Sequence, residues 1–163
     1  MEESRLKLLQ EMPIFGGVTE STLRLVLDRA PIVTAAKNSC FFHQGDQADS
    51  VFVLEQGQVA VLKSFRGREY LLRTLERGDC FGEMALMDLL PRSASIVALE
   101  DSRAIEISAA TLYEIYAQDI EQFVLIQMNM GREVSRRLRA ADDRLLEARM
   151  DAQASEALGF YSV

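Results

Sequence analysis

The chain has 163 residues, of which 48% are hydrophobic and 26% are charged, a composition typical of one globular domain and too short for two ordinary ones. Acidic side chains outnumber basic ones by 25 to 18, and a net charge of -7 disfavours a free-standing nucleic-acid-binding protein, because its surface repels phosphate backbones. Two cysteines and one histidine do not make a disulfide framework or a conventional zinc site, so we expect a reducing, cytoplasmic environment and no metal. No apolar run approaches the ~20 residues of a membrane span, and no membrane segment is expected.

Two short helices are predicted at the N-terminus. Leucines at helical spacing favour a helix over residues 3–12, which Pro13 ends. Thr19 is a suitable N-cap for the second helix, whose apolar face contains Leu23 and Val26.

From residue 32 the pattern changes to short strand-like runs separated by turns that contain glycine. The runs are expected at 32–35, 39–43, 51–54, 59–64, 70–76, 95–100 and 103–107. Two of the connections, around Gly57 and Gly67, are typical of hairpins. Many short strands with glycine turns predict a small antiparallel barrel or roll, so the expected fold class is mainly β with flanking helices (α+β).

Two more helices are predicted after the strands. Ser108 is expected to cap a short helix that ends near Tyr116, and Asp119 to cap a long helix that extends to residue 150. Small and apolar side chains recur along the long helix with heptad spacing, which favours self-association through a seam formed by Val134, Leu138, Ala141, Leu145 and Ala148. The alternative is a helix that covers its own domain. Residues 151–163 have no sustained periodicity and are predicted to form a tail.

The segment with the most distinctive chemistry lies between the strand-like runs 70–76 and 95–100. It begins Phe-Gly-Glu-Met-Ala-Leu-Met at residue 81, where Gly82 allows close backbone approach and the following N–H groups favour an anion. Nine residues after Glu83, Arg92 stands beside small side chains and can grip a phosphate through a fork of hydrogen bonds. A carboxylate accepts hydrogen bonds from hydroxyls, so the pair suits a sugar phosphate. On residue types alone, a structural Glu–Arg salt bridge explains it equally well.

The order Phe-Gly-Glu-Met-Ala-Leu-Met, three residues and then Pro-Arg-Ser-Ala-Ser resembles the phosphate-binding cassette of the cyclic nucleotide-binding domain family. That family includes transcription factors of the catabolite activator protein type, regulatory subunits of cyclic-nucleotide-dependent kinases, and gated channels. Upstream, residues 41–46 and 51–59 are similar to the opening signature of the family's β-roll. The resemblance implies a double-stranded β-helix, or jelly-roll-like β-roll, with N-terminal helices and a long C-terminal helix.

The resemblance also implies the domain limits. Residues 1–118 would form the cyclic nucleotide-binding roll with its N-terminal helices. Residues 119–150 would form the lid and dimerisation helix, followed by the tail.

Residue by residue, the resemblance implies a ligand site at Gly82, Glu83, Met84, Ala85, Arg92, Ser93 and Ala94. Glu83 would accept a hydrogen bond from the ribose 2′-hydroxyl of a 3′,5′-cyclic nucleotide, and Arg92 would pair with the cyclic phosphate. Backbone N–H groups around Ala85 and the hydroxyl or N–H of Ser93 would also reach the phosphate.

Three further positions bear on the base. Val61 and Leu72 match positions where aliphatic side chains of the family contact the base. Asp142 matches a position on the long helix where the bacterial transcription factors use hydroxyl groups to contact adenine. An ionised aspartate only accepts hydrogen bonds, so Asp142 suits the N–H donors of guanine better than the amino group of adenine. The alternative is a solvated charge beside Asp143. Family frequency favours cAMP, and cGMP stays open.

The resemblance implies a sensor and no enzyme, because the cassette offers no activated nucleophile, general base or metal. We expect a protein that needs no cofactor, forms a homodimer and signals nucleotide occupancy to an unknown downstream protein through the long helix. One alternative is the sensory part of a transcription factor whose DNA-binding domain is absent, since the 13 residues after Met150 are too few for a helix-turn-helix domain. Direct nucleic-acid binding is therefore not expected. Another alternative is an adaptor with the same fold that signals without ligand.

Overall fold

The computed structural model describes residues 1–159, which divide into two compact units: Met1–Met130, and the part that begins at Gly131. The helices are α1 (Glu2–Glu11), the 3-10 turn η1 (Pro13–Phe15), α2 (Glu20–Arg29), α3 (Glu83–Asp88), α4 (Ala109–Gln118) and α5 (Ile120–Gly159). The strands are β1 (Ile32–Ala35), β2 (Cys40–Phe42), β3 (Ser50–Gln56), β4 (Val59–Phe65), β5 (Arg68–Leu75), β6 (Cys80–Phe81), β7 (Ser95–Ala98) and β8 (Ser102–Ser108).

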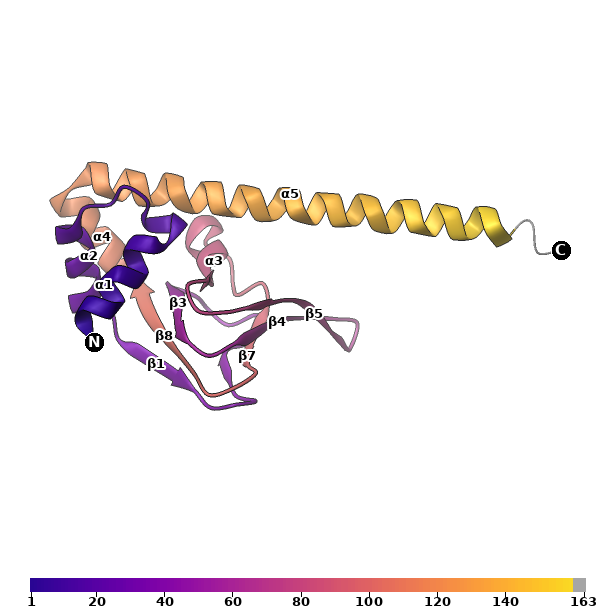
Figure 1. The fold of residues 1–163 in the computed structure, drawn as a ribbon, viewed down its shortest axis with the longest axis horizontal. Coiled ribbons are helices and arrows are strands. Elements are labelled where there is room, and N and C mark those ends of the chain that lie inside the picture. The colour runs from indigo at the N-terminus through magenta and orange to yellow at the C-terminus, as the bar shows by residue number, and fades with distance from the viewer. Residues whose placement is uncertain (160–163) are drawn as a thin grey trace. The chain divides into compact units, whose positions relative to one another are not determined.

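The strands form two four-stranded antiparallel sheets, in the orders β1-β8-β3-β6 and β2-β7-β4-β5 (Figure 1). Side chains alternate across each strand, so each sheet turns one apolar face toward the other. Phe52 and Phe81 stack between the sheets with ring centroids 5.2 Å apart, and Leu54 and Val59 are fully buried beside them. The predicted β-roll with flanking helices is confirmed.

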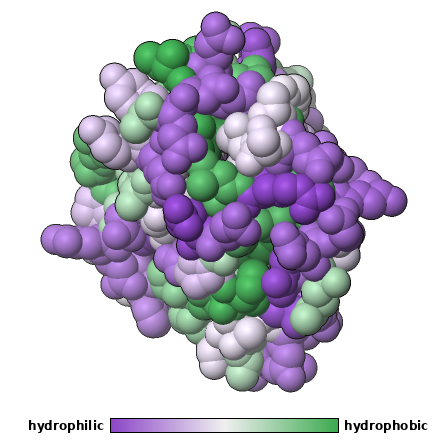
Figure 2. Space-filling model, turned by 90° about the vertical axis from the view of Figure 1, so that its left-hand side faces the viewer, coloured by the Kyte–Doolittle hydropathy of each residue, from purple (hydrophilic) through white to green (hydrophobic). Residues whose placement is uncertain are grey.

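Helices α1, α2 and α4 gather at one end of the roll, where they bury a second apolar cluster against β3 and β8 (Figure 1). Its fully buried members include Leu9, Leu23, Ile107 and Ile115. A buried side chain of this size stabilises the fold by roughly 1.5–3 kcal/mol relative to an exposed one. Figure 2 shows the outside of this end, where hydrophilic side chains cover most of the surface and hydrophobic atoms show between them.

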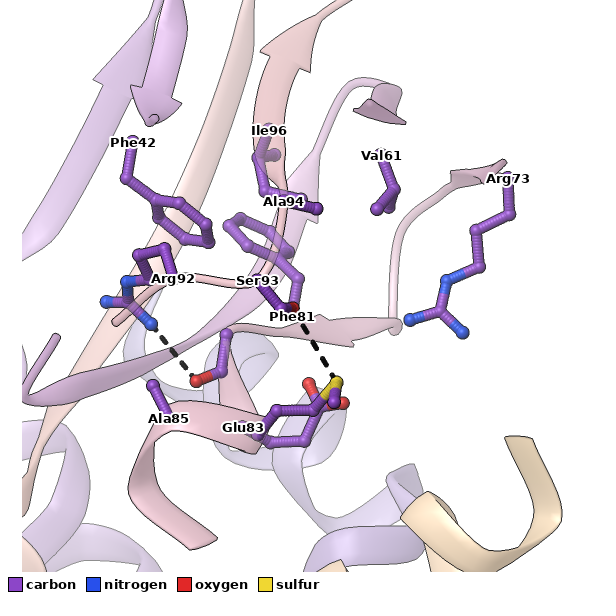
Figure 3. Close-up of a pocket in the computed structure, with 12 residues that line it drawn as sticks. Phe42, Val61, Arg73, Phe81, Glu83, Ala85, Arg92, Ser93, Ala94 and Ile96 are labelled. Carbon is purple, nitrogen blue, oxygen red and sulfur yellow. Dashed lines mark hydrogen bonds between the residues drawn. The ribbon is translucent and has the colours of Figure 1, made fainter. Parts of the chain in front are cut away.

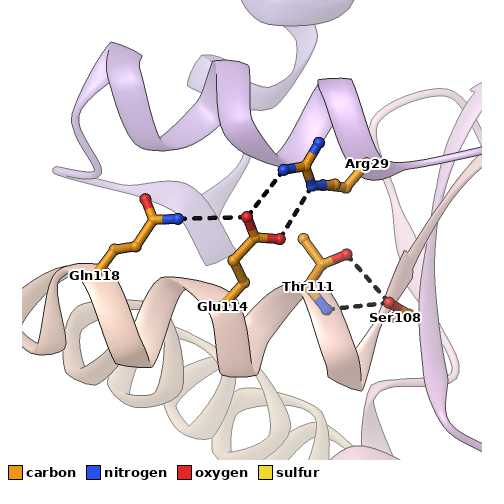
Figure 4. Close-up of polar contacts among 5 residues, drawn as sticks. All are labelled: Arg29, Ser108, Thr111, Glu114 and Gln118. Atoms are coloured by element: carbon orange, nitrogen blue, oxygen red, sulfur yellow. Dashed lines mark hydrogen bonds and ion pairs between the residues drawn. The ribbon is translucent and has the colours of Figure 1, made fainter.

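Polar contacts join α2 to α4 and cap the N-terminus of α4 (Figure 4). The guanidinium of Arg29 on α2 donates to both carboxylate oxygens of Glu114 on α4, at 3.0 Å each. The Ser108 hydroxyl accepts from the backbone N–H of Thr111 at 3.1 Å, which confirms the predicted N-cap of α4. Thr19 lies at the N-cap position of α2, but its side chain forms no hydrogen bond that caps the helix.

The first turns of α5 belong to the first unit. Asp119 caps the helix as predicted, because its Oδ1 accepts from the N–H of Gln122 at 3.2 Å. Buried Asn129 donates from Nδ2 to the carbonyls of Ile14, at 3.3 Å, and Gly16, at 2.9 Å. The limit between the units therefore lies at residue 130, twelve residues after the predicted domain limit at 118.

Helix α5 continues to Gly159, so the predicted tail is wrong for residues 151–159. Six of these nine residues, three alanines with Gln153, Glu156 and Leu158, are good helix formers even where no apolar stripe recurs. The rest of the predicted tail, residues 160–163, lies outside the described residues. Within residues 1–159, no helix has the length and apolar character that crossing a bilayer requires.

Candidate functional site

One pocket on the first unit brings together all seven residues for which the sequence predicts ligand contact (Figure 3). Its lining also includes the predicted base-wall residue Val61 and four residues that the sequence did not single out, Phe42, Arg73, Phe81 and Ile96. The residues come from β6 of the first sheet, from α3 and its N-terminal turn, from the segment before β7, and from the second sheet.

Gly82 forms the turn between β6 and α3. Its φ of +83° lies in the left-handed region, which favours glycine. A Cβ at this position would lie 2.5 Å from Nη1 of Arg92 and 3.3 Å from the carbonyl oxygen of Ser50. Only a residue without a side chain therefore lets the arginine pass this close to the turn. The next residue, Glu83, starts α3 and is only 3% exposed.

Arg92 is 6% exposed and its guanidinium is held on several sides. Nη1 donates to the carbonyl oxygens of Ser50, at 2.8 Å, and Gly82, at 3.0 Å, and Nη2 donates to Ser50 Oγ at 3.2 Å. The Ser50 hydroxyl in turn donates to Glu106 on β8 at 2.8 Å. The guanidinium also lies over the ring of Phe42, 4.0 Å from its centroid, where a cation is attracted to the π face.

These contacts use Nη1 and Nη2 of Arg92 but not its Nε. Among the described residues, Nε of Arg92 is buried and has no hydrogen-bond partner. Burial lowers the pKa of Arg92 from its ordinary value, and carboxylates led by Asp49 and Glu106 partly offset that effect. An arginine stays protonated at neutral pH nonetheless. The pocket therefore contains a buried cation with a free N–H, a combination suited to an anionic oxygen.

The floor of the pocket is a row of four side chains, one from each strand of the second sheet. Phe42 on β2 pairs with Ile96 on β7, Ile96 with Val61 on β4, and Val61 with Arg73 on β5. All four line the pocket. Arg92 lies over the β2 end of this row, and Arg73 forms its β5 end.

Leu72 is not among the lining residues, and its neighbour Arg73 is. The register explains the difference: Val61 pairs with Arg73 and Leu62 with Leu71, so Leu72 is the extra residue of a β-bulge. Its side chain is 49% exposed. Arg73 therefore lines the pocket where the sequence predicts Leu72, and the contact of Leu72 with a base stays a prediction. Asp142 belongs to the second unit and is exposed, so its contact with a base stays a prediction.

Ile96, Phe42, Arg73 and Ser50 were not predicted from the sequence, and they differ in how clearly a local sequence pattern indicates their position. Ile96 lies two positions after Ala94, so strand alternation alone would have placed both on one face. Phe42 and Arg73 reach the pocket through pairings between distant strands and through the bulge. Ser50 holds Arg92 across 42 positions of the chain, and no local pattern marks that contact.

The arrangement suits binding of a molecule that carries both an anion and a hydroxyl. Arg92 supplies the positive charge, and Glu83, the residue after Gly82, supplies an acceptor in the same pocket. No group of three or more histidine, cysteine, aspartate or glutamate side chains suitable for a metal occurs among residues 1–159.

Residues 32–119, just over half of the chain, match the model of a family described as cyclic nucleotide-binding domain. The chain is 32% identical over 131 residues to the cyclic AMP receptor protein of Thermus thermophilus, covering 80% of this chain and 59% of that protein. It is 34% identical over 100 residues to cGMP-dependent protein kinase, isozyme 1, of Drosophila melanogaster, covering 60% of this chain and 13% of the kinase. The chain thus spans about three-fifths of the bacterial relative and a small part of the kinase.

The fold is likewise similar to solved structures. A cyclic nucleotide-binding domain from Methylobacillus flagellatus aligns with a TM-score of 0.78 and 23% identity, covering 89% of this chain and 82% of the other.

Proposed function

The chain belongs to the cyclic nucleotide-binding domain family, and from that premise we propose that it binds a 3′,5′-cyclic nucleotide in the pocket between α3 and the second sheet. The observation that carries this proposal is Arg92, a buried cation whose Nε has no acceptor among the described residues. The equatorial oxygen of a cyclic phosphate is an acceptor of the required charge. Glu83 would accept from the ribose 2′-hydroxyl, and the main chain around Ala85 and Ser93 would reach the phosphate.

The first-choice ligand is cAMP. The bacterial relative is named as a cyclic AMP receptor protein, and it is matched over 80% of the chain. The Drosophila relative is named for cGMP, so the choice of base needs its own argument from the pocket.

We further propose that occupancy is passed to a downstream protein through α5. Ser50, which holds Arg92, follows Asp49, whose carbonyl accepts from the N–H of Ala109 at the start of α4 at 2.7 Å. A ligand that binds Arg92 would therefore change the contacts of residues 49–50, which are hydrogen-bonded to the start of α4. Helix α4 is followed directly by α5. The ligand shifts the balance between two arrangements only if it binds them with different affinity.

Self-association through α5 is part of the same proposal. The seam residues with large side chains, Leu138 and Leu145, are 61% and 53% exposed in the single chain. A second copy that covers them would remove that apolar surface from water. Two alternatives remain proposals as well: the sensory part of a longer transcription factor, and an adaptor that needs no ligand.

Isothermal titration calorimetry of the chain with cAMP, cGMP and 5′-AMP tests the binding proposal. We expect saturable heat with at least one cyclic nucleotide and much weaker binding of 5′-AMP, whose phosphate is not fixed across the ribose. Absence of heat with both cyclic nucleotides would favour the ligand-independent adaptor.

A further inference from the structure

The hydroxyl of Ser50 lies between Arg92 and a carboxylate of the first sheet. Ser50 is 2% exposed, and its Oγ accepts a hydrogen bond from Nη2 of Arg92 at 3.2 Å. The same hydroxyl donates to Oε1 of Glu106 at 2.8 Å. Figure 3 shows the near end of this series, with the Arg92 guanidinium beside the ring of Phe42. Its far end, Glu106, is not among the residues that line the pocket.

The register of the first sheet brings Glu106 to Ser50. Ser50 pairs with Ser108 and Phe52 with Glu106, so Ser50 and Glu106 are diagonal neighbours across β3 and β8. Alternate residues of a strand face the same side, so both side chains lie on one face of the sheet. The backbone N–H of Glu106 donates to the carbonyl of Pro31 at 3.0 Å, which also fixes β8 at this position from its other side.

A single proton decides what the Ser50 hydroxyl can offer to Arg92. A hydroxyl has one proton to donate and lone pairs that accept, whereas a guanidinium only donates. An ionised carboxylate only accepts, so Glu106 takes the Ser50 proton and leaves the lone pairs of Oγ for Nη2. Without Glu106, that proton would be free to turn toward Nη2 and oppose the contact.

We propose that Glu106 is a positioning residue: it keeps Ser50 an acceptor for Arg92, and so holds the guanidinium in the orientation that leaves its Nε for the cyclic phosphate. The inference rests on the proposed function, because it concerns how the phosphate-binding side chain is oriented. Simple electrostatics gives the opposite expectation. A carboxylate this close to the site repels an anionic ligand, so its removal alone would strengthen binding.

Calorimetric titration of the wild type, Ser50→Ala, Glu106→Ala and the double variant with cAMP and cGMP tests this inference. We expect each single variant to weaken both nucleotides by about fivefold, since one hydrogen bond that orients Arg92 is lost. The double variant should bind no more weakly than either single variant, because Glu106 acts only through the Ser50 hydroxyl.

Two further substitutions of Glu106 separate positioning from a structural role. Glu106→Gln keeps an acceptor for Ser50 and should bind both nucleotides within about twofold of the wild type. Glu106→Val suits a strand but removes the acceptor, so it should show the same loss as Glu106→Ala. Urea unfolding of each variant identifies those that are folded, and affinities are compared among these.

Glu100→Ala is the matched control, because Glu100 is an exposed glutamate two residues before β8 and its replacement removes the same charge. It should leave both affinities unchanged. Additive losses in the double variant, or wild-type or stronger binding by folded Glu106→Ala and Glu106→Val, would overturn the role of Glu106 while leaving the proposed function intact. Failure of the wild type to bind either nucleotide would overturn both.

Discussion

Gly82 and Arg92 depend on each other for their positions. Nη1 of the arginine lies 2.5 Å from the position that a Cβ of residue 82 would take, and it donates a hydrogen bond to the carbonyl of that same residue. The glycine also has a positive φ, which a substituted residue would adopt only with strain. Two independent physical demands, space and backbone conformation, thus select glycine at this turn.

Replacing Gly82 with alanine should therefore damage both stability and binding. Gly67→Ala is the control, since Gly67 also has a positive φ, of +74°, but a Cβ at that position would have nothing within 4 Å of it. We expect Gly67→Ala to lower the free energy of unfolding by about 1 kcal/mol through backbone strain alone. Gly82→Ala should cost more and weaken cyclic nucleotide binding, as measured by urea unfolding and calorimetry. Equal costs for the two variants, with binding unchanged in both, would contradict the steric role of Gly82.

Among the elements, those with a local signal were predicted from the sequence and those that depend on distant contacts were not. Ser108 and Asp119 mark helix starts through their own side chains, and the strands follow from alternation and glycine turns. The two-residue β6 exists only because β3 pairs with it, and the bulge at Leu72 is set by pairing with β4. The cassette was read from its order of residues, whereas Ser50, Phe42 and Arg73 required the folded sheets.

The contact between α2 and α4 gives a pH-dependent prediction. The hydrogen bonds from Arg29 hold the pKa of Glu114 below its ordinary value (Figure 4). A carboxylate with a depressed folded pKa stabilises the fold above its unfolded pKa, and loses that contribution as pH falls through the folded value. Glu114→Gln should therefore be less stable than the wild type at pH 7, with a gap that closes in acid, as measured by urea unfolding.

The difference in free energy of unfolding between the wild type and Glu114→Gln should also shrink at high salt, because the Arg29–Glu114 pair is exposed enough for ions to screen it. A difference that persists unchanged at acid pH would show that the charge of Glu114 is not what stabilises the contact. Glutamine keeps an acceptor for Arg29, so the variant isolates the charge from the hydrogen bond.

At the scale of the whole molecule, an acidic chain of net charge -7 contains a pocket lined by the buried cation Arg92. The second feature at this scale is α5, whose residues from 138 to 157 are all exposed in the single chain. Apolar side chains at heptad spacing on such a helix favour a partner helix over solvent.

Leu138→Glu combined with Leu145→Glu should convert a dimer into a monomer, because each charge would have to be buried in the seam. Sedimentation velocity measures the change. Leu146→Glu combined with Met150→Glu is the matched control, since both residues are exposed but lie outside the heptad seam positions. The control should remain dimeric. A dimer that persists in the Leu138→Glu, Leu145→Glu variant would show that the interface lies outside the predicted seam.

The dissociation constant of Arg92→Ala for its cyclic nucleotide tests the central claim most directly. A hydrogen bond to a charged group contributes about 1.5–3 kcal/mol, so we predict an affinity at least about tenfold weaker than that of the wild type. Arg66→Ala, which removes an exposed arginine from the β4–β5 hairpin, should leave the affinity unchanged. Wild-type affinity in a folded Arg92→Ala protein would contradict the assignment of this pocket to the cyclic phosphate.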